Sequence, residues 1–326
     1  MADQLRLQLD AKVKAAQSNA FAPSTQRTYE VQKKSFYSFC ALLKIPPIPI
    51  STHNVCRYAV YLSDTKKYST IKLYLNIIRL LHQEAGLPNP LDAFNVKQTL
   101  RGLKRQLGCD VKRKIAIEPK HLSHLFSKIQ HNNTTHVVYF GAALVMFFTL
   151  LRRSNLLTTK STFDPTKHLR RKDIVFNAEG ATITIRWSKT NQFKSGDVVF
   201  PIPRLKDHHL CPVKWAMWAT SIVPSSPDGP CFLIDTDTPL TPDKFVHLTK
   251  TFLSDIVSDP SDLGAHSFRR GGATFCYQHS NSIAITKALG LWKSDCYQDY
   301  VLPSAPILAQ ATKVIGDALS DMPIPP

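Results

Sequence analysis

The feature that most constrains the fold is an apolar run of fifteen residues, VVYFGAALVMFFTLL, at positions 137–151. A membrane-spanning helix needs about 20 apolar residues. This run is shorter, contains small and polar residues, and ends at Arg152 and Arg153. It therefore predicts a helix buried in a protein core, and no membrane partner is expected. Other elements must cover that helix, and a chain of 326 residues is long enough to form two domains with their own cores.

Apolar spacing along the chain predicts a mainly helical protein. Within the first hundred residues, apolar positions recur at helical spacing in segments that prolines separate. After helices expected near 119–130 and 136–151, alternating and β-branched residues predict three short strands, and helices return from Leu210. The fold class is therefore mainly α with a small antiparallel β-sheet (α+β). The strands are expected near residues 173–176, 181–187 and 197–201.

These patterns divide the chain into four parts. We expect a helical domain over residues 1–110 and a second domain over 119–303, joined by a basic linker at 111–118. Residues 304–326 would form an amphipathic C-terminal helix.

Charge is unevenly distributed along the chain. The net charge is +17, and residues 1–120 alone hold 20 Lys and Arg against 8 Asp and Glu. A polyanion such as double-stranded DNA is the expected partner, because neutralised phosphates release condensed counterions; the alternative is high solubility alone. The residues expected to contact DNA phosphates are Lys33, Lys34, Lys66, Lys67, Lys72, Arg101, Lys104, Arg105, Lys112, Arg113 and Lys114.

The seven cysteines are scattered, odd in number and without a C-x-x-C pair, which is typical of reduced thiols in a cytosolic or nuclear protein. The N-terminus lacks the apolar core of a signal peptide. His208, His209 and Cys211 lie close together, but no second ligand pair follows at zinc-finger spacing. No metal site or other cofactor is therefore expected.

Six residues, spread in order through the second predicted domain, suit attack on a phosphodiester. The charge of the transition state must be met by fixed cations, and arginine grips two phosphate oxygens at once. A tyrosine hydroxyl with a pKa near 10 needs a proton acceptor, and the leaving oxygen needs an acid such as lysine. No acidic cluster accompanies the set, so a two-metal nuclease site lacks ligands. The six are Arg152, Lys189, His266, Arg269, Trp292 and Tyr300.

The order and the sequences of these motifs resemble those of the tyrosine recombinases, the group of Cre and the lambda-type integrases. Leu151–Asn155 (LRRSN) resembles the family's first arginine box, and Lys189 lies between two predicted strands, where the family carries its β-hairpin lysine. HSFR at 266–269 resembles the H-x-x-R box, and LGLW at 289–292 resembles the element that donates to the phosphate. Tyr300 falls where the nucleophile is expected. The sequence HSFRRGGAT, followed by GLWKSD, looks most like the corresponding motifs in recombinases of Crypton and DIRS-like elements.

The resemblance implies a role for each residue. Arg152 and Arg269 would clamp the scissile phosphate. His266 would accept or shuttle the proton of Tyr300, which would form a 3′-phosphotyrosyl link, and Lys189 would protonate the leaving 5′-oxygen. Because that link conserves the bond energy, strand transfer would need neither metal nor ATP.

The chain departs from the family's pattern at two positions. Asn155 stands where the family often has an acid, so the support of Arg152 is open. Trp292 precedes Tyr300 by eight residues, where many members have nine. The alternatives within the motifs are Arg153 for Arg152, Lys194 for Lys189 and Tyr297 for Tyr300.

The family implies a site-specific recombinase of a mobile element, acting in the nucleus. Its helical core-binding (SAM-like) domain and catalytic domain would form a C-shaped clamp on DNA. The C-terminal helix would dock on a neighbouring protomer, giving a homotetramer on two duplexes, or fold back on its own chain. Two alternatives stay open: a domesticated protein that binds DNA without cutting it, and an enzyme like the type IB topoisomerases.

Overall fold

The computed structural model describes residues 2–108, 113–158, 163–187, 196–280, 282–292, 294–300 and 313. It divides the chain into two compact units, Met1–Val111 and Lys112–Pro326. The predicted class is confirmed, since helices dominate both units and small antiparallel sheets lie in the second. Several predicted features lie outside the described residues: Lys112, Lys189, Lys194 and, apart from Lys313, the C-terminal helix of 304–326.

The first unit is helical throughout its described elements. Phe36, Tyr58, Ile71 and Val96 come from four different helices and are fully buried at its core. The N-terminal helix, in contrast, buries none of its residues. The elements are α1 (Ala2–Ser18), α2 (Pro23–Leu42), α3 (Thr52–Ser63), α4 (Tyr68–Glu84), η1 (Pro90–Asp92) and α5 (Phe94–Leu107).

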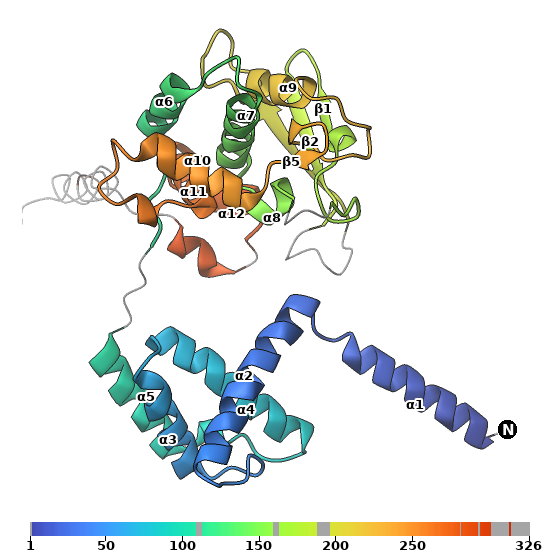
Figure 1. The fold of residues 1–326 in the computed structure, drawn as a ribbon, viewed down its shortest axis with the longest axis vertical. Coiled ribbons are helices and arrows are strands. Elements are labelled where there is room, and N and C mark those ends of the chain that lie inside the picture. The colour runs from blue at the N-terminus through green and yellow to red at the C-terminus, as the bar shows by residue number, and fades with distance from the viewer. Residues whose placement is uncertain are drawn as a thin grey trace, which may run out of the picture. The chain divides into compact units, whose positions relative to one another are not determined.

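Helix α7 (Thr134–Thr149) lies at the centre of the second unit (Figure 1), as the apolar run predicts. Asn133 caps its N-terminus by accepting a hydrogen bond from the backbone N–H of His136. A Cβ on Gly141 would lie 2.7 Å from the Cβ of Ala219, so glycine is needed for the close approach of α9. The surrounding helices are α6 (Pro119–Lys128), α9 (Pro212–Ser221), α10 (Pro242–Leu253) and α11 (Ala265–Ser280).

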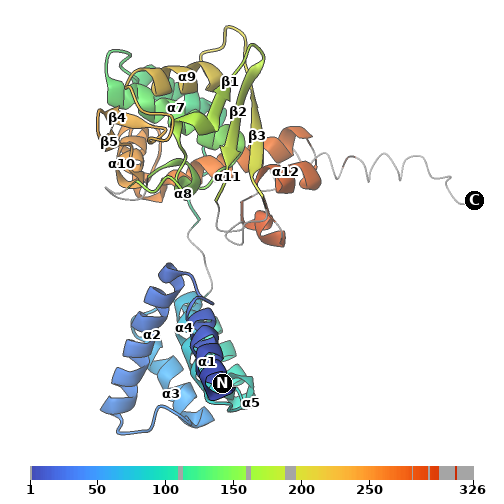
Figure 2. The ribbon, with the colours of Figure 1, turned by 90° about the vertical axis from the view of Figure 1, so that its right-hand side faces the viewer.

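The three predicted strands form one antiparallel sheet in the order β1-β2-β3 (Figure 2). Ile183 pairs with Ile174 on one side and with Phe200 on the other, and all three side chains are buried. A second, two-stranded sheet was not predicted. The strands are β1 (Ile174–Phe176), β2 (Gly180–Ile185), β3 (Val198–Pro203), β4 (Leu233–Asp235) and β5 (Thr238–Pro239).

Residues 115–117 belong to the second unit by their hydrogen bonds. The backbone N–H of Ile115 donates to Asp262, and that of Ile117 donates to Ser267 on α11. The remaining elements of this unit are short. They are α8 (Arg153–Leu156), η2 (Arg171–Asp173), η3 (Pro260–Asp262), α12 (Ile283–Leu289) and η4 (Asp295–Asp299).

Candidate active site

Helix α11 carries two of the predicted site residues, and two glycines let it sit deep in the unit. A Cβ on Gly271 would lie 1.8 Å from the carbonyl oxygen of Ile117, and one on Gly272 would lie 2.1 Å from that of Phe147. Real side chains cannot occupy such space, so the GG pair after HSFRR fixes the depth of the helix. His266 and Arg269 lie three residues apart, and so about one turn apart, on this helix, and Arg269 contacts the end of α7.

Arg269 is a fixed, buried cation. Its side chain is 2% exposed, and its guanidinium donates to the carbonyl of Leu150 and, at 2.7 Å, to that of Gly290. The same group lies 4.2 Å from the ring centre of Trp292 and 5.2 Å from that of Tyr300. One arginine therefore joins the end of α7, the end of α12 and the segment that carries Tyr300.

Leu150 ends α7 in a left-handed backbone conformation, with φ of 52°. The turn leads directly to Arg152, which is half-buried, and to Arg153, which is exposed and begins α8. Because Arg269 bonds the carbonyl of Leu150, the cation of α11 also fixes the turn from which Arg152 projects.

His266 and Tyr300 are in direct contact. The Nε2 atom of His266 lies 2.9 Å from the hydroxyl oxygen of Tyr300, and the hydroxyl of Thr274 donates to the backbone carbonyl of Tyr300 at 3.0 Å. His266 is exposed and Tyr300 is half-buried, so a ligand can reach both.

Two physical effects favour the neutral form of the His266 imidazole. Desolvation and then nearby positive charges lower the pKa of His266 below its usual value of about 6.5. The charges are those of Arg269, Arg152 and Arg153. A neutral imidazole can accept a proton at Nε2, so His266 can take the hydroxyl proton of Tyr300. The charges also place both arginines of the first box within electrostatic range of His266.

Trp292 completes the cluster as a packing surface. It is 5% exposed, and its ring centre lies 5.0 Å from that of Tyr300. A Cβ on Gly290 would lie 1.8 Å from the indole, so the glycine of the LGLW motif makes room for the ring. The indole, the Arg269 guanidinium and the Tyr300 ring thus lie against one another.

The two tyrosines that compete for the nucleophile's role have different surroundings. Tyr297 is 9% exposed and packs in a small apolar cluster with Leu150, Ala273 and Trp292. Its ring centre lies 5.4 Å from the Lys287 ammonium. Tyr300, in contrast, presents its hydroxyl to a proton acceptor. The geometry therefore favours Tyr300 over Tyr297.

Lys189 and its alternative Lys194 lie outside the described residues, but the two residues that follow β2 make specific contacts. The amide Nδ2 of Asn155, which is 3% exposed, donates to the carbonyl of Trp187 at 2.9 Å. The neighbouring Arg186 donates to the buried carboxylate of Asp173 at 2.8 Å. In the sequence, Asn155 stands out only as a departure from the pattern of the tyrosine recombinases. Its long-range contact ties the first arginine box to the strand that precedes Lys189.

The basic residues of the first unit are mostly exposed, as phosphate contacts require. Lys33 and Lys66 are half-buried; the first is 3.8 Å from Glu30, and the second lies over the ring of Tyr74. In the second unit, Arg113 and Lys114 are exposed, and the ammonium of Lys114 donates to the carbonyl of Ser261. The exposed members of the first unit are Lys34, Lys67, Lys72, Arg101, Lys104 and Arg105.

Among the described residues, no group of three or more His, Cys, Asp or Glu side chains could hold a metal ion. The Sγ atom of Cys211 instead accepts hydrogen bonds from the backbone N–H groups of Leu205 and Lys214. None of the described helices has the length and apolar character needed to span a membrane.

The likeness to known proteins lies in the fold. Neither family models nor curated proteins match the sequence. Among solved structures, the Tn1549 transposon integrase in complex with transposon right end DNA matches with a TM-score of 0.62 and 14% identity, over 95% of this chain and 98% of that one. A lambda integrase dimer bound to a core site matches with a TM-score of 0.57 and 15% identity, over 88% and 91%. A lambda integrase tetramer bound to a Holliday junction matches with a TM-score of 0.57 and 17% identity, over 90% and 75%.

Over nearly its whole length, the chain therefore has a fold like that of these integrases.

Proposed function

We propose that this protein is a site-specific tyrosine recombinase that cleaves and rejoins DNA through Tyr300. The observation that carries the proposal is the contact between the Tyr300 hydroxyl and His266, beside the buried cation of Arg269. A protein that only binds DNA needs no hydroxyl held against a neutral base. The likeness to integrase structures over most of the chain supports the same class.

In the proposed reaction, Arg152 and Arg269 hold the non-bridging oxygens of the scissile phosphate, with Trp292 as a further donor. His266 accepts the hydroxyl proton as the Tyr300 oxygen attacks phosphorus. The bond to the 5′-oxygen breaks, and Lys189 supplies the proton that this leaving oxygen takes up. The 3′-phosphotyrosyl link then transfers to a second 5′-hydroxyl, which returns Tyr300 to its starting state without metal or ATP.

Arg269 is held beside the Tyr300 ring because its guanidinium donates to the carbonyls of Leu150 and Gly290. From this position its charge stabilises the developing charge on the phosphate, because preorganised cations act electrostatically in a water-poor site.

Double-stranded DNA is the proposed substrate. A homotetramer on two duplexes is the proposed assembly, with the segment 304–326 docked on a neighbouring protomer; the lambda integrase tetramer on a Holliday junction supports it by analogy. We propose that the protein is encoded by a mobile element of the Crypton or DIRS-like kind, which the sequence motif HSFRRGGAT supports, and that it acts in the nucleus.

The test is a covalent adduct on nicked suicide duplexes drawn from the ends of the element. Wild type, Tyr300→Phe and Tyr297→Phe are compared on denaturing gels, with protease digestion to identify the bound protein. We expect an adduct that only Tyr300→Phe abolishes. Loss only in Tyr297→Phe would transfer the nucleophile's role to that residue. Tight duplex binding without any adduct, on duplexes that hold the element's true ends, would favour a domesticated binder. Relaxation of plasmids that lack these ends would favour the topoisomerase alternative.

A further inference from the structure

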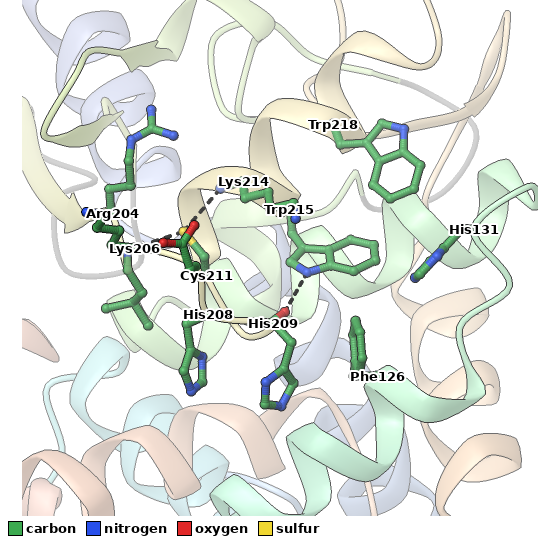
Figure 3. A pocket seen from close by; sticks show the side chains of 12 residues that line it. Phe126, His131, Arg204, Lys206, His208, His209, Cys211, Lys214, Trp215 and Trp218 are labelled. Carbon is green, nitrogen blue, oxygen red and sulfur yellow. Dashed lines mark hydrogen bonds between the residues drawn. The ribbon is translucent and has the colours of Figure 1, made fainter.

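A second site of a different kind lies on the second unit. A pocket of about 640 Å³ opens between α6, α9 and the segment that follows β3 (Figure 3). In both Figure 1 and Figure 2, α9 lies across this unit from α8, which belongs to the candidate active site. The recombinase chemistry makes no use of this pocket. Its lining residues are Phe126, His131, Arg204, Leu205, Lys206, Asp207, His208, His209, Cys211, Lys214, Trp215 and Trp218.

One end of the pocket is a wall of ordered rings (Figure 3). Trp215 and Trp218 are stacked, with ring centres 5.2 Å apart and planes 30° from parallel, and His131 lies 5.6 Å from each. The indole N–H of Trp215 donates to the carbonyl of His209 at 2.8 Å, which fixes the buried ring. Trp218 remains half-exposed, so the wall is built in advance and accessible to a flat group.

The other end is cationic. Arg204, Lys206 and Lys214 line the pocket against one carboxylate, that of Asp207. Arg204 is held in place by donating to the carbonyls of Ala178 and Asn177, both at 3.0 Å. Lys206 and Lys214 are exposed. The fixed charge of the lining favours an anion with more than one negative charge.

We propose that this pocket binds a nucleotide, with its base against Trp218 and His131 and its phosphate against Lys206 and Lys214. A flat ring system joined to an anion matches a pocket whose aromatic and cationic residues lie at opposite ends. Aromatic side chains bind bases of any sequence because every base has a π-face. An acidic peptide would meet the lysines but has no planar group for the rings. The volume is within the usual range of ligand pockets.

The nucleotide has two sources with the same chemistry: a soluble nucleotide, or an unpaired base in a single strand. The experiment uses the full chain and isothermal titration with AMP, with adenosine and inorganic phosphate as separate controls. An eight-residue oligodeoxyadenylate represents the strand. If the oligonucleotide binds more tightly than AMP and Trp218→Ala removes the difference, the pocket is a strand site. If the oligonucleotide binds no more tightly than AMP, the pocket takes a soluble ligand. Both outcomes support the pocket.

Two variants locate the bound nucleotide. Trp218→Ala should weaken AMP by about tenfold, because stacking on a single aromatic side chain contributes that order of affinity. Lys214→Ala should weaken AMP about fivefold and reduce its salt dependence, because one phosphate contact is lost. Lys214 is exposed, so this variant tests the pocket even if Trp218→Ala unfolds. Lys244→Ala, an exposed lysine on α10 outside the pocket, is the matched control.

The inference is overturned if AMP does not bind, or if Trp218→Ala and Lys214→Ala bind AMP and the oligonucleotide as wild type does. It is also overturned if hexaglutamate displaces AMP with equal affinity, since the pocket would then recognise charge alone. The test is independent of strand cleavage, because neither variant touches the cluster around Tyr300. Both variants should therefore form the covalent adduct at the wild-type rate.

Discussion

Asn155→Asp should be far more damaging than the similar shape of the two side chains suggests. Asn155 is 3% exposed, and its amide donates to the carbonyl of Trp187 at 2.9 Å. An ionised carboxylate has no proton to donate, so two oxygens would face each other in a buried position. We expect a loss of about 3–5 kcal/mol in the free energy of unfolding at pH 7, typical of an uncompensated buried charge. Asn155→Ala, which only leaves the carbonyl unpaired, should lose about 1–3 kcal/mol.

The loss of stability caused by Asn155→Asp should increase with pH. The folded protein raises the pKa of the new carboxyl above its unfolded value of about 4, because burial disfavours the charge. The destabilisation is therefore smallest below that pH and grows as pH rises through the folded pKa. At low pH the protonated carboxyl can donate to the Trp187 carbonyl, which restores the bond.

Tryptophan fluorescence during urea unfolding measures this directly, because Trp187, Trp215, Trp218 and Trp292 all lie in the second unit. Asn132→Asp, at an exposed position, is the matched control and should change the free energy of unfolding little. The reasoning is refuted if Asn155→Asp is no worse than Asn155→Ala at pH 7, or if its cost does not fall between pH 7 and pH 5.

Three further predictions follow from the packing and charge of the site. Gly271→Ala should destabilise the second unit by about 1–3 kcal/mol, because its Cβ would overlap the Ile117 carbonyl. The control Gly102→Ala, which has open space around it, should leave stability unchanged or raise it slightly. Unfolding followed by circular dichroism measures both, and an equal loss of stability in the two variants would contradict the prediction. The single-turnover cleavage rate should rise with pH through the lowered pKa of His266 and level off at a lower pH than an ordinary histidine would give, since only the neutral ring accepts a proton. The same rise with pH in His266→Gln would exclude this residue. Arg269→Lys should reduce the cleavage rate by about 10²–10³-fold while DNA affinity changes little, and a normal rate would remove this cation from the mechanism.

Local sequence patterns predicted most of the architecture because they reflect local physics. The run at 137–151 predicted α7, and alternation predicted the strands of the three-stranded sheet within a few residues. The β4–β5 pair was not predicted because strands of three and two residues are too short to show an alternating apolar pattern. The left-handed backbone of Leu150 was not predicted because leucine has no preference for that conformation. The hydrogen bond from Arg269 to the Leu150 carbonyl holds the turn instead.

The sequence predicted a set of candidate site residues but not the network of contacts among them. The spacing HSFR places His266 and Arg269 on one helix face, and this is a local property. The bonds of Arg269 to Leu150 and Gly290 join residues 119 and 21 positions apart, and such pairs have no sequence signal in a single chain. The contact of Asn155 with Trp187 spans 32 positions and was missed for the same reason.

The central claim is that the Tyr300 oxygen attacks the scissile phosphate, and peptide mapping of the covalent adduct tests it most directly. The wild-type protein is trapped on a nicked suicide duplex and digested with trypsin, and the DNA-linked peptide is sequenced by mass spectrometry. The account predicts a single modified residue, Tyr300, with a phosphodiester to the 3′ end of the cleaved strand. A link at Tyr297, or at a serine, or to a 5′ end, would contradict it.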